Sequence, residues 1–338
     1  MTAPGASGTG LAVLEVSDLV VSFKSGRGPG AWGSRSLRAV DGVSLRIDQA
    51  ETLGLVGESG SGKSTLGRAI LQLVPAESGS VVFEGSTVGP GDREGRRLLR
   101  RHAQMVFQNP LGSLNARMRV GRVVQEPLDI HRVGDQASRR RRVDELLELV
   151  GLPPDARRRH PHEFSGGQQQ RIALARALAS RPSLIICDEP VAALDVSIQA
   201  QILQLLKDLQ RGTGVSYLFI AHDLNVVRHV SQRTAIMYVG KVVEEGPSQA
   251  LFAAPRHPYT WALLSAIPVP DPSAPKRRPS LQGEIPSPTD LPSGCRFRTR
   301  CPHVRDRCES EEPRLEPVGD GTSVACHFWR EISHGRGT

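Results

Sequence analysis

Short apolar runs recur along most of the chain, and their lengths are those of β-strands. The runs at residues 14–21, 53–56, 183–187 and 216–221 are separated by polar or turn-forming segments. The last two are apolar nearly throughout, as expected for strands buried on both faces of a largely parallel sheet. The pattern therefore predicts a sheet that is covered on both sides.

Longer segments between these runs carry apolar residues at the spacing of an α-helix. Val143, Leu146, Leu147 and Val150 fall at positions i, i+3, i+4 and i+7, and Gly151 follows as a stop signal. A second stripe consists of Ile198, Ile202, Leu205, Leu206 and Leu209. Both stripes are predicted to face a core, and the alternation of strands and helices predicts an α/β fold.

Shifts in composition divide the chain into four parts. Residues 1–10 are predicted to be a disordered lead, and residues 11–266 to form one α/β unit with a glycine-rich surface loop at 24–36. Residues 267–293 are rich in proline, which sustains neither a helix nor a central strand, and are predicted to be a linker. A small extension follows at 294–338 and holds four of the five cysteines.

Composition and charge limit the classes of function. The chain of 338 residues has no apolar run near the roughly 18 to 20 residues that span a bilayer, and its start lacks the pattern of a signal peptide. We therefore expect it in the cytosol, or docked to a membrane through another subunit. Its net charge of +8 comes from scattered arginines and lysines, and only 4% of its residues are aromatic. Nucleic acid is thus not the expected partner, whereas attraction to anionic lipid or an acidic protein surface stays open.

A glycine-rich stretch between a predicted strand and a predicted helix carries the clearest chemistry. It fits the pattern G-x-x-x-x-G-K-[ST] and reads Gly57, Glu58, Ser59, Gly60, Ser61, Gly62, Lys63, Ser64 and Thr65. Glycines allow the backbone to wrap a phosphate chain with its N–H groups, and the helix N-terminus adds partial positive charge. Lys63 can reach the β- and γ-phosphates, and Ser64 can place its hydroxyl on Mg²⁺. The stretch therefore predicts a nucleotide-binding loop.

Two adjacent acids follow another predicted strand. The apolar run at 184–187 leads directly into Asp188 and Glu189. A P-loop ATPase needs a carboxylate near Mg²⁺ at such a strand end, and a second group that acts on the attacking water. Asp188 suits the metal role, and Glu189 suits the role of base.

A second candidate anion site lies at residues 164–171. Ser165 and Gln168 fit the S-x-x-[EQ] capping box, and a helix-compatible run continues to Ala179. Gly166 and Gly167 at the helix start leave backbone N–H groups exposed. Alone, this pattern is that of an ordinary capped helix. Together with the nucleotide-binding loop, it predicts a second phosphate contact.

Taken in chain order, the motifs at residues 57–65, 165–169 and 188–189 resemble the Walker A, signature and Walker B elements of ABC-type ATPases. Gln108 resembles the Q-loop glutamine, His222 the switch histidine, and Phe23 the aromatic residue that stacks on adenine. Residues 193–195 resemble the D-loop, although Ala192 stands where many members carry serine. The resemblance covers residues 11–266 and implies a P-loop NTPase domain of the ABC type, with a helical subdomain that carries the signature.

The resemblance implies that two such domains act together, head to tail. Each ATP lies between the nucleotide-binding loop of one subunit and the signature helix of the other, so the signature residues act in trans. The implied ATP contacts are Phe23, Gly57, Ser59, Gly60, Gly62, Lys63, Ser64, Thr65, Ser165, Gly166, Gly167, Gln168 and Asp195.

The resemblance also implies the catalytic roles. The implied catalytic residues are Lys63, Gln108, Glu189 and His222, and the implied magnesium-site residues are Ser64, Gln108 and Asp188. In these roles Lys63 neutralises developing charge, Glu189 polarises the attacking water and His222 contacts the γ-phosphate. Catalysis then consists mostly of positioning and electrostatics.

Further stretches resemble one group of the family, the ATPases of bacterial oligopeptide and dipeptide importers. These are residues 57–62, 160–164, 195–201, 256–260 and 294–297, and the tail through Cys301 to Cys326. The resemblance implies a peripheral ATPase on the cytoplasmic face of the membrane, paired with a second, non-identical ATPase. It also implies two membrane permeases and, indirectly, an extracytoplasmic solute-binding protein. The solute stays open, because relatives also carry nickel, glutathione or other small solutes.

The cysteines of the extension are the remaining feature. They are Cys295, Cys301, Cys308 and Cys326, whereas Cys187 is predicted to be a small buried hydrophobe in a core strand. Their spacing lacks the close pairs of most Cys₄ zinc sites, and disulfides are unusual in the cytosol. Some relatives carry a [4Fe–4S] cluster on such a tail, and four thiolates suit one. Zinc and unligated thiols stay open as alternatives.

Two rival functions use the same motifs. A soluble ABC ATPase that acts on nucleic acid or ribosomes commonly carries two cassettes or a long coiled-coil insertion, and this sequence shows neither. A partner that binds ATP without hydrolysis is disfavoured by Glu189, His222 and the intact signature. The sequence therefore favours an ATP-hydrolysing transport subunit.

Overall fold

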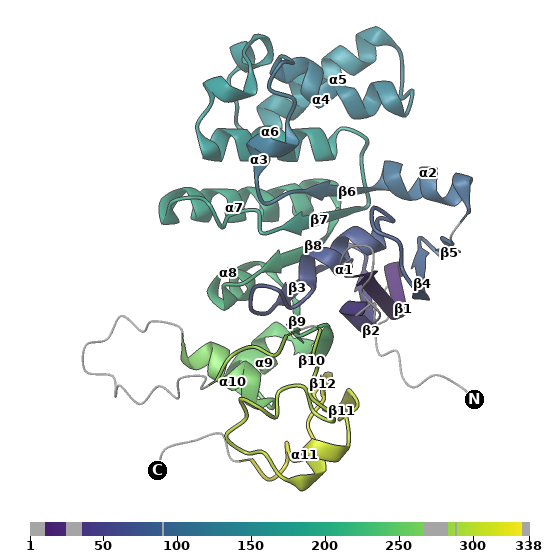
Figure 1. Ribbon diagram of the computed structural model, residues 1–338. Helices are drawn as coiled ribbons and strands as arrows, with labels where there is room; N and C mark the ends of the chain where they lie inside the picture. The colour runs from purple at the N-terminus through teal and green to yellow at the C-terminus, as the bar shows by residue number, and fades with distance from the viewer. Residues whose placement is uncertain (1–10, 25–35, 90, 267–282, 288, 333–338) are drawn as a thin grey trace, which may run out of the picture.

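The computed structural model describes residues 11–24, 36–89, 91–266, 283–287 and 289–332. The predicted disordered lead, most of the predicted surface loop, and residues 267–282 of the predicted linker lie outside the described residues. Within the described part, two β-sheets occupy the middle of the molecule, and helices pack around them (Figure 1). The α/β class predicted from the sequence is confirmed.

The larger sheet has eight strands, in the order β11-β12-β10-β9-β3-β8-β7-β6. In chain order they are β3 (Thr52–Val56), β6 (Ala103–Val106), β7 (Leu184–Asp188), β8 (Ser216–Ala221), β9 (Arg233–Tyr238), β10 (Lys241–Pro247), β11 (Glu316–Gly319) and β12 (Thr322–Val324). The strands from β9 to β6 pair in parallel, and β10, β12 and β11 continue the sheet antiparallel. Every residue of β3, β7 and β8 is buried, as their apolar sequences predict.

The smaller sheet is antiparallel and covers the helix that follows the glycine-rich loop. Its strands are β1 (Ala12–Lys24), β2 (Ser36–Asp48), β4 (Ser78–Phe83) and β5 (Ser86–Thr87), in the order β2-β1-β4-β5. Helix α1 (Lys63–Ile70) contacts strands of both sheets, and its Leu66 and Ile70 are fully buried. The loop before α1 is therefore fixed between two rigid layers.

Helices pack around the larger sheet, and some of them gather at one of its edges. Before α9 they are α2 (Arg93–His102), α3 (Pro110–Ser113), α4 (Val120–Ile130), α5 (Gln136–Leu149), α6 (Gly166–Leu178), α7 (Val196–Thr213) and α8 (Leu224–Val230), with 3₁₀ turns at Pro154–Arg158 and Pro161–Glu163. Helices α3 to α6 gather beyond the β6 edge, at the top of Figure 1. The two predicted apolar stripes lie on α5 and α7 and pack into the core. Gly151 follows α5 with a φ of 71°, which suits glycine.

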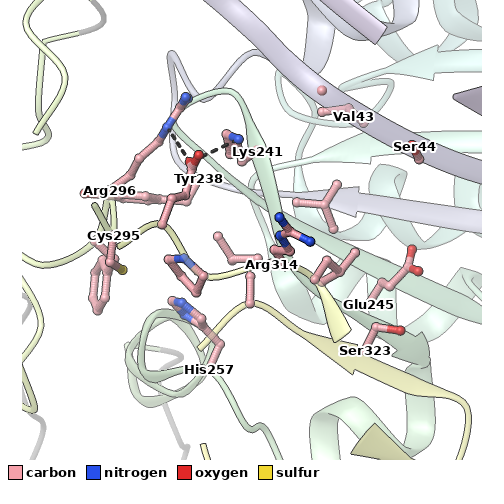
Figure 2. Close-up of a pocket in the computed structure, with 18 of the residues that line it drawn as sticks. Val43, Ser44, Tyr238, Lys241, Glu245, His257, Cys295, Arg296, Arg314 and Ser323 are labelled. Carbon is pink, nitrogen blue, oxygen red and sulfur yellow. Dashed lines mark ion pairs between the residues drawn. The ribbon is translucent and has the colours of Figure 1, made fainter. Parts of the chain in front are cut away.

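The C-terminal extension continues the larger sheet. Helices α9 (Ser248–Ala253) and α10 (Pro258–Ser265) precede it, and α11 (Asp306–Ser310) lies within it. Strand β12 pairs with β10, where Glu244 lies opposite Val324 and Glu245 opposite Ser323. A cavity of 940 Å³ remains between the extension, the β9–β10 hairpin and the smaller sheet (Figure 2). Among the described helices, none is both long and apolar enough to cross a membrane.

Candidate active site

The glycine-rich loop is pressed against neighbouring backbone on two sides. A Cβ atom at Gly57 would lie 2.1 Å from the carbonyl oxygen of Met237, and one at Gly62 would lie 2.1 Å from that of Ala39. Gly62 also has a φ of 103°, a conformation that side chains rarely adopt. The fold itself therefore requires glycine at both ends of the loop, while Ser59 and Gly60 lie exposed at its tip.

Lys63 is held inside this loop. Its Nζ donates to the carbonyl oxygens of Gly57 at 2.7 Å and Glu58 at 2.9 Å, and to Oγ of Ser61 at 3.3 Å. Lys63 is only 5% exposed, and burial lowers its pKa, opposed by the negative charge of Glu189. The ammonium group is thus placed on the path that a phosphate chain would follow along the loop.

A hydroxyl and a carboxylate meet beneath the loop. Ser64 Oγ donates to Asp188 Oδ1 at 2.7 Å, and the guanidinium of Arg68 lies 3.8 Å from the other carboxylate oxygen. Burial raises the pKa of Asp188, while the hydrogen bond from Ser64 opposes that rise. Oxygen donors of this kind fit Mg²⁺, which commonly takes one or two protein ligands and completes its shell with water and phosphate. Thr65 lies half-buried on the same helix.

Glu189 lies where the ends of three adjacent parallel strands, β6, β7 and β8, come together. Gln108 Nε2, just beyond β6, donates to Glu189 Oε2 at 2.9 Å, and His222 Nδ1, just beyond β8, lies 3.3 Å from the same oxygen. Glu189 has a φ of 48°, and its N–H donates to the carbonyl of Ile220 at 2.9 Å. A strained backbone of this kind persists only where its surroundings hold it, and such residues cluster at functional sites. The arrangement can hold a carboxylate ready to accept a proton from water.

The signature residues lie apart from this cluster. Ser165 and Gln168 form the capping box at the start of α6, with Gln168 N–H donating to Ser165 Oγ at 3.4 Å and Ser165 N–H donating to Gln168 Oε1 at 3.1 Å. Ser165, Gly166 and Gln168 are exposed, and Gly167 is half-buried. Among the described residues no hydrogen bond or ion pair links them to the loop, and α6 and α1 lie in separate layers (Figure 1). One chain therefore holds two separate half-sites.

Two further predicted ATP contacts also face solvent. Phe23 on β1 is 41% exposed, and Asp195 is exposed at the N-cap of α7, where its side chain caps no backbone N–H. Their roles stay predictions.

Sequence reasoning missed two residues, Arg300 and Tyr259, that hold the loop at Glu58. Arg300 donates from both terminal guanidinium nitrogens to the carboxylate of Glu58, at 2.6 and 3.1 Å. The N–H of Glu58 donates to the hydroxyl of Tyr259 at 2.9 Å. Tyr259 and Arg300 lie in stretches that resemble the family, but the sequence predicted no role for either residue. The available signal was a basic residue directly beside Cys301 in a short tail.

The four cysteines of the extension line one small cavity of 20 Å³. Burial raises the pKa of Cys295 to about 12 and that of Cys301 to about 11, and the neighbouring cysteines add to both shifts. Four converging thiols fit an iron–sulfur cluster in kind and number. Within the described residues, however, no three Cys, His, Asp or Glu side chains are arranged as a metal-binding group. Cys187 is fully buried in β7.

Comparison with known proteins agrees with the fold. A model of the ABC transporter family matches residues 40–192, and one of the oligopeptide/dipeptide transporter C-terminal region matches residues 243–308. A putative oligopeptide transport ATP-binding protein of Bacillus subtilis is 48% identical, over 95% of this chain and 96% of its own. A putative peptide import ATP-binding protein of Brucella abortus is 52% identical, over 94% of each chain.

Solved structures give the same result for the fold. The ATP-binding cassette MJ0796, a dimer in a post-hydrolysis state bound to ADP and Pi, aligns with a TM-score of 0.61 and 31% identity. The alignment covers 70% of this chain and 98% of that one. CbiO1 of Clostridium perfringens, part of the ABC transporter complex cbiONQ, aligns with a TM-score of 0.62 and 27% identity, over 72% and 91% of the two chains.

The fold and the site together define a P-loop ATPase of the ATP-binding cassette type. This chain belongs to the family of ABC transporter ATP-binding proteins that carry the oligopeptide/dipeptide transporter C-terminal region.

Proposed function

We propose that this chain hydrolyses ATP to drive the import of oligopeptides or dipeptides through membrane permease subunits. One observation carries the proposal: in an ABC cassette, Lys63 at the start of α1 lies close enough to Asp188 and Glu189 at the end of β7 for their charges to act on it, and Ser64 donates to Asp188. The named peptide import relatives, similar over nearly their whole length, support the substrate class.

The chain's own groups suit the first half of the reaction. Lys63 would exchange its carbonyl partners for the β- and γ-phosphates, which are stronger acceptors because they are charged. Ser64 and Asp188 would hold Mg²⁺, with Gln108 completing the site. When bound, the metal would supply positive charge that offsets the negative charge developing during phosphoryl transfer.

Glu189 would act on the attacking water. Gln108 and His222 orient its carboxylate from two sides, so little reorganisation is needed when it accepts the proton. His222 is 54% exposed at its side chain and would turn to the γ-phosphate once ATP is in place. Phe23 would stack on the adenine ring.

The second half of each site would come from a partner. Ser165, Gly166, Gly167 and Gln168 would contact the ATP of a second ABC ATPase, which we expect to be a non-identical homologue, with Asp195 between the two sites. Two permeases would hold the pair at the cytoplasmic face of the membrane. A solute-binding protein outside the membrane would deliver the solute. Nucleic acid is not a partner in this proposal.

Uptake by whole cells tests the function. A strain that lacks this gene should lose uptake of labelled di- and oligopeptides, regain it with the wild-type gene, and fail to regain it with Lys63→Ala. Normal peptide uptake with lost nickel or glutathione uptake would contradict the peptide assignment and support those solutes. Failure to copurify with any permease, together with binding to ribosomes or nucleic acid, would favour the soluble ATPase.

We further propose that Cys295, Cys301, Cys308 and Cys326 hold a [4Fe–4S] cluster. Their convergence on one cavity and the proximity that couples their pKa values support this proposal. Protein purified without oxygen should contain about four irons and four sulfides, absorb visible light, and lose both in Cys301→Ser. Colourless protein with one bound zinc, or with no metal at all, would contradict it.

A further inference from the structure

The cysteine-bearing extension reaches the nucleotide-binding loop through one buried side chain. Arg300 is 8% exposed, and both of its terminal nitrogens bond the carboxylate of Glu58. The two-pronged bond fixes direction as well as distance, and these hydrogen bonds raise the pKa of Arg300. The partners stand 242 positions apart in the sequence.

Glu58 is the anchored end of the loop. Its N–H donates to the hydroxyl of Tyr259 at 2.9 Å, so this amide already has a partner within the fold. Its carbonyl accepts from Lys63 Nζ at 2.9 Å and from the N–H of Ser61 at 3.2 Å. The position of Glu58 therefore helps to fix both the ammonium group of Lys63 and the turn at the loop tip.

An aromatic cluster holds Arg300 in place. Tyr238, Tyr259 and Phe297 are all fully buried, with ring centroids 4.6 to 5.5 Å apart. The guanidinium of Arg300 lies 5.9 Å from the centroid of the Tyr238 ring. Phe297 comes from the extension itself, between Cys295 and Cys301. Arg300 and Phe297 belong to the same segment of the extension, so both contacts depend on how this segment packs.

A second contact joins the extension to the loop by way of the β9–β10 turn. Arg296 donates to the carbonyl of Val239 at 2.5 Å and pairs with Asp41. In this turn, Gly240 N–H donates to the carbonyl of Ser61 at 2.8 Å. Figure 2 shows Arg296 and Lys241 on the same wall of the cavity beside Tyr238. The loop is held from the extension at two points.

We propose that Arg300 is a positioning residue of the ATP site, so that the extension preorganises the nucleotide-binding loop. Without Arg300, the Glu58 end of the loop would have to become ordered when ATP binds. The free energy spent on this ordering would weaken the affinity for ATP. The same cost would apply to the ground state and the transition state. Loss of Arg300 should therefore raise KM and leave kcat nearly unchanged. This inference rests on the proposed ATP site.

The test uses the purified full-length chain and titration with a fluorescent ATP analogue. Arg300→Gln should weaken affinity by roughly tenfold, the scale of one lost charge-assisted hydrogen bond. Arg298→Gln is the matched control, because it removes the same charge from the same segment, and the side chain of Arg298 bonds only Ser293 in the described structure. It should change affinity by less than about twofold.

A double-mutant cycle separates positioning from general destabilisation. Glu58→Gln should resemble Arg300→Gln, and the double variant should be no weaker than the worse single one, because both remove one contact. Arg300→Lys should recover part of the affinity. Fully additive effects, unchanged affinity in Arg300→Gln, or a fall in kcat without a rise in KM would overturn the inference.

Two controls keep the outcomes distinct. Affinities are compared well below the melting temperature of each variant, and if Arg300→Gln does not fold, Glu58→Gln with Arg300→Lys carries the test. Lys63→Ala reports on the site itself. If it binds ATP normally, the proposed ATP site is wrong. If it loses binding while the Arg300 and Glu58 variants do not, only the positioning role fails.

Discussion

The nucleotide-binding loop and the start of the signature helix are both predicted anion sites at helix N-termini, yet their side chains are held in opposite ways. At the loop, Lys63 is 5% exposed and bonded on three sides. At the signature, Ser165 and Gln168 are exposed and cap each other. The loop is therefore organised by buried contacts within its own chain, whereas the signature residues face solvent.

Gly62 in the loop and Gly166 at the signature differ in the space around them. At Gly62 a Cβ atom would collide with the backbone of Ala39, so the fold demands glycine there. At Gly166 a Cβ would lie 3.4 Å from the side chain of Leu194, which is an ordinary contact. The described fold therefore leaves room for a larger residue at Gly166. A close approach by a partner's nucleotide would explain why this position is glycine.

The largest expected effect is a loss of ATP turnover without a loss of ATP binding. Glu189→Gln should lower ATP turnover by about 10² to 10⁴, the usual contribution of a general base, while ATP affinity changes little. Turnover is measured by phosphate release, and affinity by titration. Near wild-type turnover would remove Glu189 from this role.

The next effect tests whether the loop binds alone. Lys63→Ala should weaken ATP affinity of the isolated chain by roughly 10 to 100-fold, because it removes charged hydrogen bonds to phosphate. Ser165→Ala, at the other half-site, should leave that affinity unchanged. Equal losses in both variants would mean that one chain forms the whole site, contrary to the comparison.

A matched pair of glycine substitutions sharpens the contrast. Gly62→Ala should abolish ATP binding by the single chain, because the loop cannot keep its course past Ala39. Gly166→Ala should keep single-chain affinity and melting temperature, and lose turnover only in the assembled transporter. A clear drop in melting temperature for Gly166→Ala would show that this glycine serves the fold.

The smallest effect concerns pH. Burial raises the pKa of Asp188, so its carboxylate takes up a proton at a higher pH than an exposed one. Mg²⁺-dependent ATP binding should weaken as the pH falls from 7 through that raised pKa, by up to about tenfold per pH unit. Asp188→Asn should lack this dependence in titrations with and without Mg²⁺.

The stability of the nucleotide-free chain should respond with the opposite sign. Because the folded-state pKa of Asp188 lies above its unfolded value, ionisation of Asp188 opposes folding at neutral pH. This contribution disappears as the pH falls through the raised pKa. The stability difference between Asp188→Asn and wild type should therefore narrow on acidification, as measured by thermal melts.

Local patterns allowed much of the fold to be predicted. The burial of β3, β7 and β8 follows from their continuous apolar runs, and α5 and α7 follow from their helical spacing. The capping box at Ser165 was predicted from two residues, because its bonds join positions three apart. Neighbouring residues determine such features.

The extension shows where local patterns fail. The sequence predicted a proline-rich linker and a small extension after it, but no local pattern indicated that β12 pairs with β10 and continues the main sheet. The partner of β12 lies about eighty positions earlier, and short strands carry little signal for such a pairing. The convergence of Gln108 and His222 on Glu189 was likewise implied only by family resemblance, since it depends on strand order.

The sequence by itself determined the chemical groups of this ATPase and their places at strand and helix ends, because periodicity and turn chemistry act over a few residues. Only the tertiary structure decided that Glu58 is held by Arg300 and Tyr259. It also decided that the two half-sites lie apart in one chain. These features arise when β-strands and loops distant in sequence pack together, because a buried charge is tolerated only where the fold brings a partner to it.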